Sequence, residues 1–213
     1  MADRMEVKVF WQLFIHESYA IPANCKTILD CGANAGIFSV WAARQCPEAK
    51  ITALEPFPST FAELEVNLKQ NNLENRVRAV PFGLAATEGT RLIRTAGDSP
   101  DRRLVLDSTA QAPVDTITVS CMSLAQCLDR YQLPTVDLMK MDIEGSEWEV
   151  LLSTEPSVLG RIKHIQLEYH EVAAHFGYTP EKLFAHLAAA GHKLTYRDED
   201  SNRTGIARFE LGA

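Results

Sequence analysis

The sequence first excludes several classes of protein by what it lacks. It has no apolar run near the length of a membrane span, and the start Met1–Glu6 lacks the charged-then-apolar layout of a secretory signal. Its cysteines are odd in number, scattered and without C-x-x-C spacing: Cys25, Cys31, Cys46, Cys121 and Cys127. We therefore expect reduced, mostly buried thiols in a cytoplasmic protein without a membrane span.

The chain also lacks an excess of basic residues and any linker, repeat or low-complexity segment. Its 21 lysines and arginines against 28 aspartates and glutamates give a net charge of −7. This balance argues against a nucleic-acid partner, because such binding needs a basic face. The 213 residues, 46% of them hydrophobic, suffice for one α/β domain and are few for two, so we expect a single domain over residues 1–213.

A third absence is the dinucleotide-binding fingerprint G-x-G-x-x-G. In its place, Thr27–Trp41 gives an apolar strand ending in Asp30, a loop of small residues and a helical pattern, with the spacing D-x-G-x-x-x-G. Gly32 and Gly36 allow a sharp turn and a close approach to a ligand, and Asn34 tolerates a left-handed backbone. A carboxylate beside the free N–H groups of a helix start is typical of a nucleotide-type site in an α/β sheet.

The next strand, Ile51–Glu55, also ends in a carboxylate, at the place where a ribose diol would bind. Asp30 would repel a pyrophosphate, whereas it suits the ammonium or hydroxyl groups of S-adenosylmethionine. The two strands therefore favour S-adenosylmethionine over a dinucleotide as the cofactor.

Hydrophobic patterns predict further strands over residues 77–80, 114–119, 135–142, 162–170, 192–196 and 206–211. Helices are predicted to start at two capping-box spacings, Thr60 with Glu63 and Ser123 with Gln126, and at Thr179.

Two segments break the alternation of strands and helices. Residues 87–122 contain turn signals and are predicted to form an inserted β excursion. This segment contains four arginines, Arg91, Arg94, Arg102 and Arg103. They either bind an acidic group of the substrate or, more simply, form a solvated face that discourages pairing of the edge strand with another chain. Residues 1–24 form an aromatic-rich N-terminal arm that either packs on the sheet, the ordinary fate of such residues, or serves as a lid over the substrate.

Polar side chains alternate along the strands 135–142 and 162–170. Lys140 and Asp142 share one face of the first strand. The second strand has a polar row on one face: His164, Gln166, Glu168 and His170. A sandwiched parallel strand is normally apolar on both faces, so these polar groups need partners. We predict a buried ion pair between Lys140 and Glu168.

Four motifs follow one another in order: Asp30–Gly36, Ala53–Pro58, Lys140–Glu147 and Glu168–His170. Together they resemble the class I methyltransferases, and more narrowly the FkbM family of small-molecule O-methyltransferases, over roughly residues 27–170. The resemblance implies an α/β, Rossmann-like fold with a mostly parallel seven-stranded sheet, a C-terminal antiparallel hairpin and helices on both faces. It also implies a set of cofactor-binding residues: Asp30, Gly32, Ala33, Asn34, Gly36, Glu55, Pro56, Leu84 and Asp142.

A hydroxyl acceptor needs a base, because its neutral oxygen is a poor nucleophile. Asp142, at a strand end beside the cofactor loop, and His170, with an ordinary pKa near neutrality, are the two candidates. Asp142 could instead hold the cofactor's amino group, and His170 could be a loop histidine without a catalytic role. Lys140 and Glu168 are expected to brace the site rather than to react.

Asp142, Glu168 and His170 also form an oxygen-and-imidazole set suited to Mg²⁺ or Mn²⁺. Their spacing matches no tight metal motif, so the sequence leaves a divalent metal open without predicting one. Glu144 and Glu147, near the next helix start, either face the acceptor or favour the helix dipole.

The predicted function is transfer of a methyl group from S-adenosylmethionine to a hydroxyl of a small molecule, such as a sugar, a polyketide or another secondary metabolite. The alternatives are a non-catalytic S-adenosylmethionine-binding or assembly protein and a nicotinamide-dependent oxidoreductase, which the missing fingerprint disfavours. The aromatic arm is compatible with a homodimer.

Overall fold

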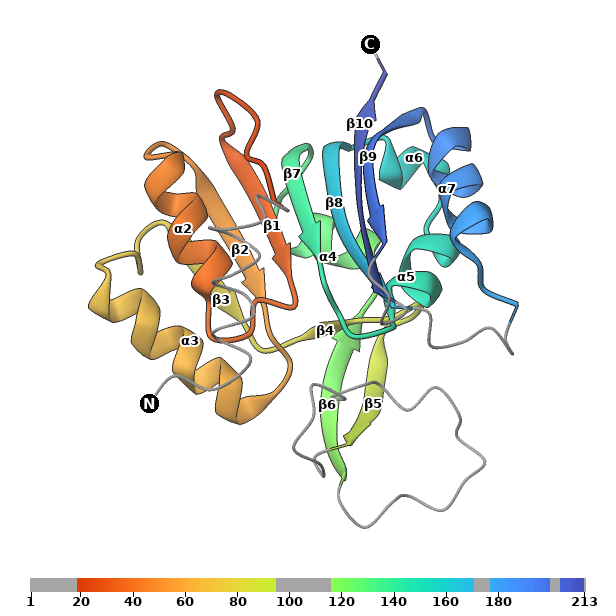
Figure 1. The fold of residues 1–213 in the computed structure, drawn as a ribbon. Coiled ribbons are helices and arrows are strands. Elements are labelled where there is room, and N and C mark those ends of the chain that lie inside the picture. Colours follow the sequence, from red (N-terminus) through yellow and green to blue (C-terminus); the bar gives the residue numbers. More distant parts are fainter. Residues whose placement is uncertain (1–18, 95–115, 171–176, 200–203, 213) are drawn as a thin grey trace.

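The computed structural model describes residues 19–94, 116–170, 177–199 and 204–212. Within them, seven strands form the main sheet in the order β3-β2-β1-β7-β8-β10-β9 (Figure 1). Strands β3, β2, β1, β7 and β8 run parallel, and β10 is antiparallel to β8 and β9. The predicted mostly parallel sheet with a C-terminal antiparallel hairpin is confirmed.

The strands of the main sheet are β1 Thr27–Cys31, β2 Lys50–Leu54, β3 Val77–Val80, β7 Val136–Met141, β8 Ile162–His170, β9 His192–Glu199 and β10 Thr204–Leu211. The helices of the described residues are α2 Ile37–Gln45, α3 Pro58–Gln70, α4 Leu124–Arg130, α5 Glu147–Ser153, α6 Pro156–Leu159 and α7 Pro180–Ala189. In this part of the chain, no helix is both long and apolar enough to cross a membrane.

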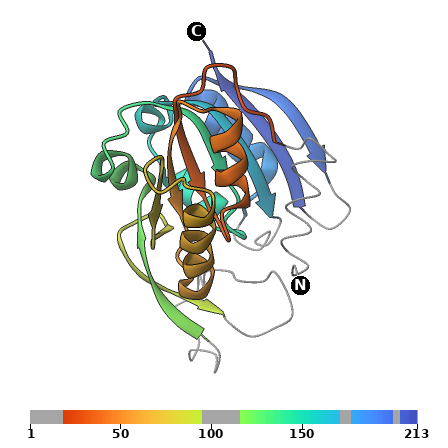
Figure 2. The same cartoon turned by 90° about the vertical axis from the view of Figure 1, so that its left-hand side faces the viewer.

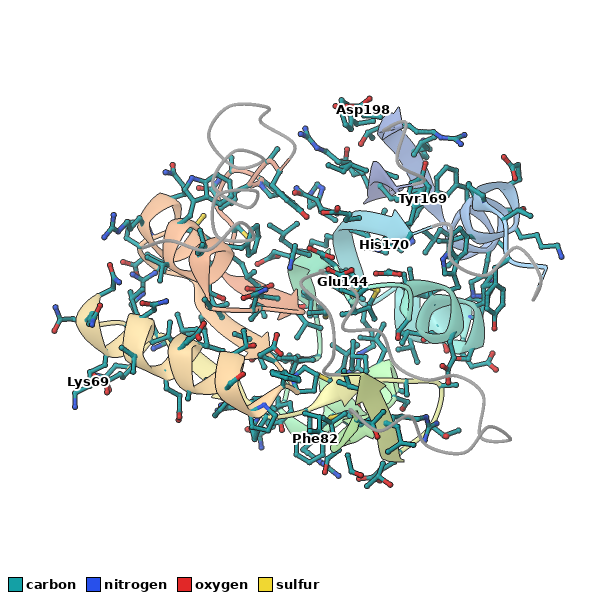
Figure 3. All side chains as sticks on the ribbon, turned by 60° about the horizontal axis from the view of Figure 1, so that its bottom comes forward. Lys69, Phe82, Glu144, Tyr169, His170 and Asp198 are labelled. Atoms are coloured by element: carbon teal, nitrogen blue, oxygen red, sulfur yellow. The ribbon has the colours of Figure 1, made fainter. Side chains whose placement is uncertain are left out.

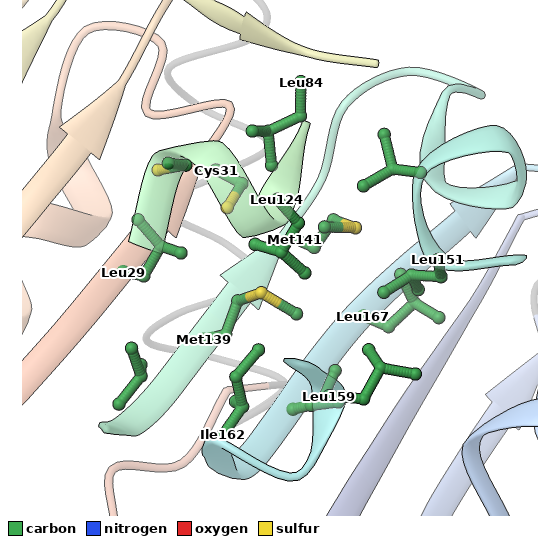
Figure 4. Packing of buried hydrophobic residues seen from close by; sticks show 14 of the residues in the cluster. Leu29, Cys31, Leu84, Leu124, Met139, Met141, Leu151, Leu159, Ile162 and Leu167 are labelled. Atoms are coloured by element: carbon green, nitrogen blue, oxygen red, sulfur yellow. The ribbon is translucent and has the colours of Figure 1, made fainter. Parts of the chain in front are cut away.

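The two faces of the sheet pack against different helices, because successive strand residues point to opposite sides. Ile28 and Leu138 join the cluster formed with α2 and α3, the helices that Figure 2 brings to the front. Their neighbours Leu29 and Met139 join the larger cluster with α4, α5, α6 and α7, part of which Figure 4 shows. Both faces are therefore apolar, as expected for parallel strands between two helical layers.

All three predicted helices are present, and two of the three predicted capping residues are correct. Ser123 accepts the N–H of Gln126 at 3.2 Å, and the Gln126 side chain accepts the N–H of Ser123 at 2.9 Å, which completes a capping box. Thr179 caps α7 through the N–H of Lys182. The Thr60 prediction is wrong, because α3 already begins at Pro58 and Thr60 is buried inside the helix. A proline is well suited to a first helical turn, where its missing N–H has no partner to lose.

A second, small sheet is built by the segment after β3. Strands β5 Gly89–Arg94 and β6 Thr116–Met122 form an antiparallel hairpin, and β4 Gly83–Leu84 pairs with β6 in parallel. In Figure 1 this sheet lies below the edge where the parallel strands end. Arg91 of β5 has partners within the protein: its guanidinium donates to Thr87 Oγ1 at 3.2 Å and pairs with Glu149 of α5 at 4.0 Å. Arg102 and Arg103 lie outside the described residues.

The five cysteines are all free thiols, and four of them are buried while Cys46 is half-buried. Burial raises the pKa of Cys25 and of Cys127 to about 12, so both remain protonated at neutral pH. These thiols behave as small apolar residues of the core.

Candidate active site

The candidate active site lies at the carboxyl ends of β1, β2, β7 and β8. Parallel neighbours end at the same edge of a sheet, so the loops after these strands meet there. Figure 3 looks toward this edge, with Glu144 and His170 labelled close together near its centre. The site residues predicted from β1, β2, β7 and β8 are therefore brought together.

The loop after β1 is shaped by three residues with left-handed backbones, at φ 76° for Gly32, 50° for Asn34 and 86° for Gly36. A Cβ on Gly32 would lie 1.8 Å from the carbonyl oxygen of Asp142, and one on Gly36 would lie 2.5 Å from Leu64 Cδ1. The glycines are thus required where the loop packs on the β7–α5 loop and on α3. The sequence predicts a close approach to a ligand for these glycines, and the structure adds this internal packing.

Glu55 joins the loops that follow β1 and β2. Its carboxylate accepts the N–H of Asn34 and the N–H of Phe57, each at 2.9 Å, and the residue is largely buried. Two backbone bonds hold this acidic group at a fixed position. Ala33, in the loop after β1, and Leu84, in β4, are buried, and Pro56 is half-buried.

Asp30 and Lys140 form the buried charged centre beneath the loop. The register of β1 and β7 places them side by side, with Lys140 Nζ 3.4 Å from Asp30 Oδ1 and 2.7 Å from the carbonyl oxygen of Gly32. Ser39 donates its hydroxyl to Asp30 at 2.7 Å, a partner that the sequence analysis did not identify. Asp30 is 0% exposed, and its contacts with Lys140 and Ser39 hold its carboxylate beneath the loop.

Lys140 has a second carboxylate partner in Asp142, at 4.0 Å. Burial alone lowers the pKa of Lys140, but the charges of Asp30 and Asp142 outweigh it and raise the pKa, so the ammonium stays charged. The predicted Lys140–Glu168 ion pair does not form as a direct contact: Lys140 pairs with Asp30 and Asp142, and Glu168 acts on it only as a more distant charge that helps to raise its pKa. The parallel register sets Lys140 opposite Gln166, and Glu168 lies two residues further along β8.

Glu168 and Gln166 instead contact the segment that precedes β1. Tyr19 donates its hydroxyl to Glu168 at 3.5 Å, and Gln166 bonds to both the N–H and the carbonyl oxygen of Ala20. Tyr19 also packs edge-on against Phe38 of α2 at 5.6 Å between ring centroids. Residues 19 and 20 of the predicted arm therefore pack on the sheet, while residues 1–18 lie outside the described part of the chain.

His170, at the end of β8, is held on several sides. Its Nδ1 lies 3.2 Å from Glu147 Oε1, its Nε2 lies 3.5 Å from Glu144 Oε2, and its carbonyl oxygen accepts the indole N–H of Trp148 at 2.7 Å. Burial lowers the pKa of His170, but the Glu147 hydrogen bond and the nearby carboxylates outweigh it and raise the pKa to about 10. Both ring nitrogens thus face carboxylates already.

Glu144 and Glu147 lie in and just after the turn that follows β7, with contacts that the sequence alone did not predict. Glu147 accepts the N–H of Ile143 at 2.9 Å, which fixes the turn after β7, and Glu144 has a left-handed backbone with φ 54°. Asp142, Glu144 and His170 each offer one ligand atom, all within 4.8 Å of one another. The sequence suggested Asp142, Glu168 and His170 as possible metal ligands, whereas the structure groups Asp142 and His170 with Glu144.

The fold and this strand-end site define a class of protein, the class I methyltransferases. The chain superposes on M. capricolum TrmK in complex with S-adenosyl-homocysteine with a TM-score of 0.58 and 8% identity, over 92% of this chain and 67% of that chain. It superposes on methyltransferase FkbM from Methylobacillus flagellatus KT with a TM-score of 0.61 and 14% identity, over 95% of this chain and 48% of that chain. At these identities the likeness establishes the fold.

The family follows from the sequence match to the methyltransferase FkbM domain, which covers residues 30–197. The chain belongs to the FkbM family of methyltransferases, whose cofactor is S-adenosylmethionine.

Three proteins illustrate what this chain is similar to in sequence. The chain is 27% identical to methyltransferase sdnD of Sordaria araneosa, over 76% of this chain and 74% of that protein. It is 28% identical to the 31-O-demethyl-FK506 methyltransferase FkbM of Streptomyces tacrolimicus, over 75% of this chain and 71% of that protein. It is 24% identical to AMB antimetabolite synthetase AmbE of Pseudomonas aeruginosa over 76% of this chain, but spans only 9% of that much longer protein.

Proposed function

We propose that this protein transfers a methyl group from S-adenosylmethionine to a hydroxyl group of a small molecule. The observation that carries the proposal is the fixed Glu55 carboxylate, which accepts backbone N–H groups of the loops after β1 and β2 at 2.9 Å. Glu55 follows β2 and Asp142 follows β7, so the two residues lie on either side of the end of β1. A carboxylate held in this way suits the two ribose hydroxyls of the cofactor. The O-methylated product implied by the name of the Streptomyces relative supports a hydroxyl as the acceptor group.

The residues present fit S-adenosylmethionine by the chemistry of their donor set. Glu55 would hold the ribose and the Gly32–Gly36 loop would supply the backbone beside the cofactor, with Asp142 next to that loop. When bound, the cofactor supplies a methyl group on a sulfonium, which an aligned oxygen can attack. The protein has to position the acceptor, exclude water and take up the acceptor's proton.

Asp142 is the proposed base. Its side chain is 21% exposed at the strand end, so an acceptor can reach it. His170 is less suited to this role, because its two ring nitrogens already face Glu147 and Glu144 at 3.2 and 3.5 Å. Lys140 and Glu168 act as supports of the site.

The cofactor is tested by calorimetric titration of the protein with S-adenosylmethionine, S-adenosylhomocysteine and NAD in parallel. We expect the first two to bind and Glu55→Ala to weaken both by about 10-fold or more, because the bonds lost involve a charged group. Glu65→Ala, which removes a carboxylate from the exposed side of α3, is the matched control. Binding of NAD alone would overturn the proposal.

The base is tested with Asp142→Asn, which keeps the shape of the side chain. We expect S-adenosylhomocysteine to bind within a few-fold of the wild-type affinity while methyl transfer to hydroxylated acceptors falls by roughly 10²–10⁴-fold. Unchanged turnover would remove Asp142 from the mechanism. A wild-type protein that binds the cofactor but methylates no hydroxylated acceptor would favour a non-catalytic binding protein.

A further inference from the structure

The turn after β7 and the end of β8 bring a mixed set of ligand groups together beside the cofactor loop. Asp142, Glu144 and His170 each offer one atom, and these atoms lie within 4.8 Å of one another. Ligands at about 2.1 Å from an octahedral ion are about 3–4 Å apart, so small side-chain movements allow all three to reach one cation. Asp142 and Glu144 are 21% and 24% exposed, which leaves a path for the ion from solvent.

His170 is held as a metal-ligating histidine usually is. Such a histidine commonly engages a carboxylate through its other ring nitrogen, which orients the ring toward the metal. Here Nδ1 lies 3.2 Å from Glu147 Oε1, while Nε2 is directed to Glu144 at 3.5 Å. Trp148 anchors the same residue through its backbone carbonyl at 2.7 Å. The ring is thus fixed with Nε2 on the side of Asp142 and Glu144.

An independent observation concerns Glu147, which is 0% exposed. Its Oε2 is buried and has no hydrogen-bond partner among the described residues. A buried carboxylate oxygen without a partner is costly unless positive charge lies near it. Lys140 does not meet this need directly, because its ammonium pairs with Asp30 and Asp142 at 3.4 and 4.0 Å. The nearest positive charge is His170, 3.2 Å from Glu147 Oε1, and a cation bound beside its Nε2 would add to that charge.

We propose that Asp142, Glu144 and His170 bind a divalent cation, Mn²⁺ or Mg²⁺, next to the cofactor site. Two carboxylates and one imidazole suit these oxygen-preferring ions. Its role in turnover rests on the proposed function: the cation binds two adjacent oxygens of the acceptor, as in a 1,2-diol or a hydroxyl beside a carbonyl. Asp142 can serve both purposes, because one of its oxygens binds the cation and the other faces the acceptor's proton.

The site is tested on the full chain, stripped with EDTA and desalted, by titration with MnCl₂ followed by calorimetry and by the electron paramagnetic resonance signal of free Mn²⁺. We expect one equivalent to bind. Glu144→Gln and His170→Gln should weaken binding at least 10-fold, and Glu147→Gln by about 10–100-fold because it only orients His170. Glu63→Gln, which removes one charge from the exposed side of α3, should bind as the wild type does.

Absence of Mn²⁺ binding at millimolar concentration, or binding unchanged in Glu144→Gln, would overturn the proposal. Glu144 is the decisive position because its side chain is partly exposed and its substitution disturbs the core least; bound S-adenosylhomocysteine verifies the fold of each variant. Site-dependent Mn²⁺ binding without any methyl transfer would refute the proposed function and leave the cation site standing. Methyl transfer that EDTA does not change, in a protein that binds no Mn²⁺, would refute the cation site and leave the proposed function standing.

Discussion

At the scale of single residues, Gly32 sets the distance between the two loops of the site. A Cβ there would lie 1.8 Å from the Asp142 carbonyl oxygen, and the φ of 76° disfavours any side chain. Relief requires moving the backbone that carries Asp142. We therefore expect Gly32→Ala to lower the free energy of unfolding by about 2–5 kcal/mol, measured by urea denaturation.

Gly160→Ala provides the control for this prediction. Gly160 has a φ of −62°, and a Cβ there meets its nearest atom at 3.4 Å. The free energy of unfolding should change by less than about 1 kcal/mol. Equal losses in the two variants would contradict the packing argument.

Lys140 is the second residue whose effect can be predicted. Lys140→Met leaves the carboxylate of Asp30, which is 0% exposed, without its cation at 3.4 Å. Breaking one side of a buried pair costs about 3–5 kcal/mol of unfolding free energy. The double variant Asp30→Asn/Lys140→Met should recover most of this loss, because the unpaired charge is then absent. A double variant no more stable than Lys140→Met would show that the two residues are not coupled.

At the scale of elements, Asp137 ties three strands together at the edge opposite the site. Its carboxylate accepts the N–H groups of Lys26 and Thr27 just before and at the start of β1, at 2.8 and 3.0 Å, and pairs with Lys163 of β8 at 2.7 Å. Burial raises the pKa of Asp137, but the bonds to Lys163, Lys26 and Thr27 outweigh it and lower the pKa below its ordinary value of 3.8.

A folded-state pKa below the unfolded one means that this carboxylate stabilises the protein above about pH 4. That contribution is lost as the pH falls through the folded-state pKa. Asp137→Asn should therefore lower the free energy of unfolding by about 1–3 kcal/mol at pH 7, and by progressively less as the pH falls below 4. Urea denaturation of both proteins at several pH values measures this, and a difference independent of pH would contradict it.

The elements also show what the sequence can predict. Strand-end carboxylates such as Asp30, Glu55 and Asp142 are visible because hydrophobic runs and their ends are local features of the chain. The partner of Lys140 was not predictable, because parallel register depends on how separate strands pair. Glu168 suited the ion pair by type and alternation, yet the register sets Lys140 between Asp30 and Gln166.

The same distinction holds for the turn after β7. Glu144 and Glu147 were recognisable as acidic residues near a helix start, but the left-handed φ of 54° at Glu144 decides which of them reaches Asp142. Tyr19 was one of several aromatic residues in the arm, and nothing local singled it out as the partner of Glu168. The positions of strand ends are thus predictable from sequence, whereas contacts between their side chains need the fold.

At the scale of the whole molecule, β10 connects the C-terminal hairpin to the catalytic half of the sheet. It lies between β8 and β9, and its Phe209 is buried in the larger core cluster, edge-on to Phe184 at 5.2 Å between ring centroids. Phe209→Ala should lower the free energy of unfolding by about 3–5 kcal/mol in urea denaturation. Leu194→Ala, at the exposed residue opposite Phe209 on β9, should change it by less than about 1 kcal/mol. Similarly small losses of unfolding free energy in both variants would show that β10 is not part of the core.

The place of β10 also sets an order of events while the protein is being made. β8 leaves the ribosome well before Thr204–Leu211, so its outer edge has no native strand partner during that interval. An unpaired edge strand can pair with another chain, and this one carries the end of the site at His170. The nascent chain therefore passes through a stage that is open to self-association, and slower synthesis across residues 171–203 would prolong it. His170, at the end of β8, therefore lies beside an unpaired strand edge until β10 has been made.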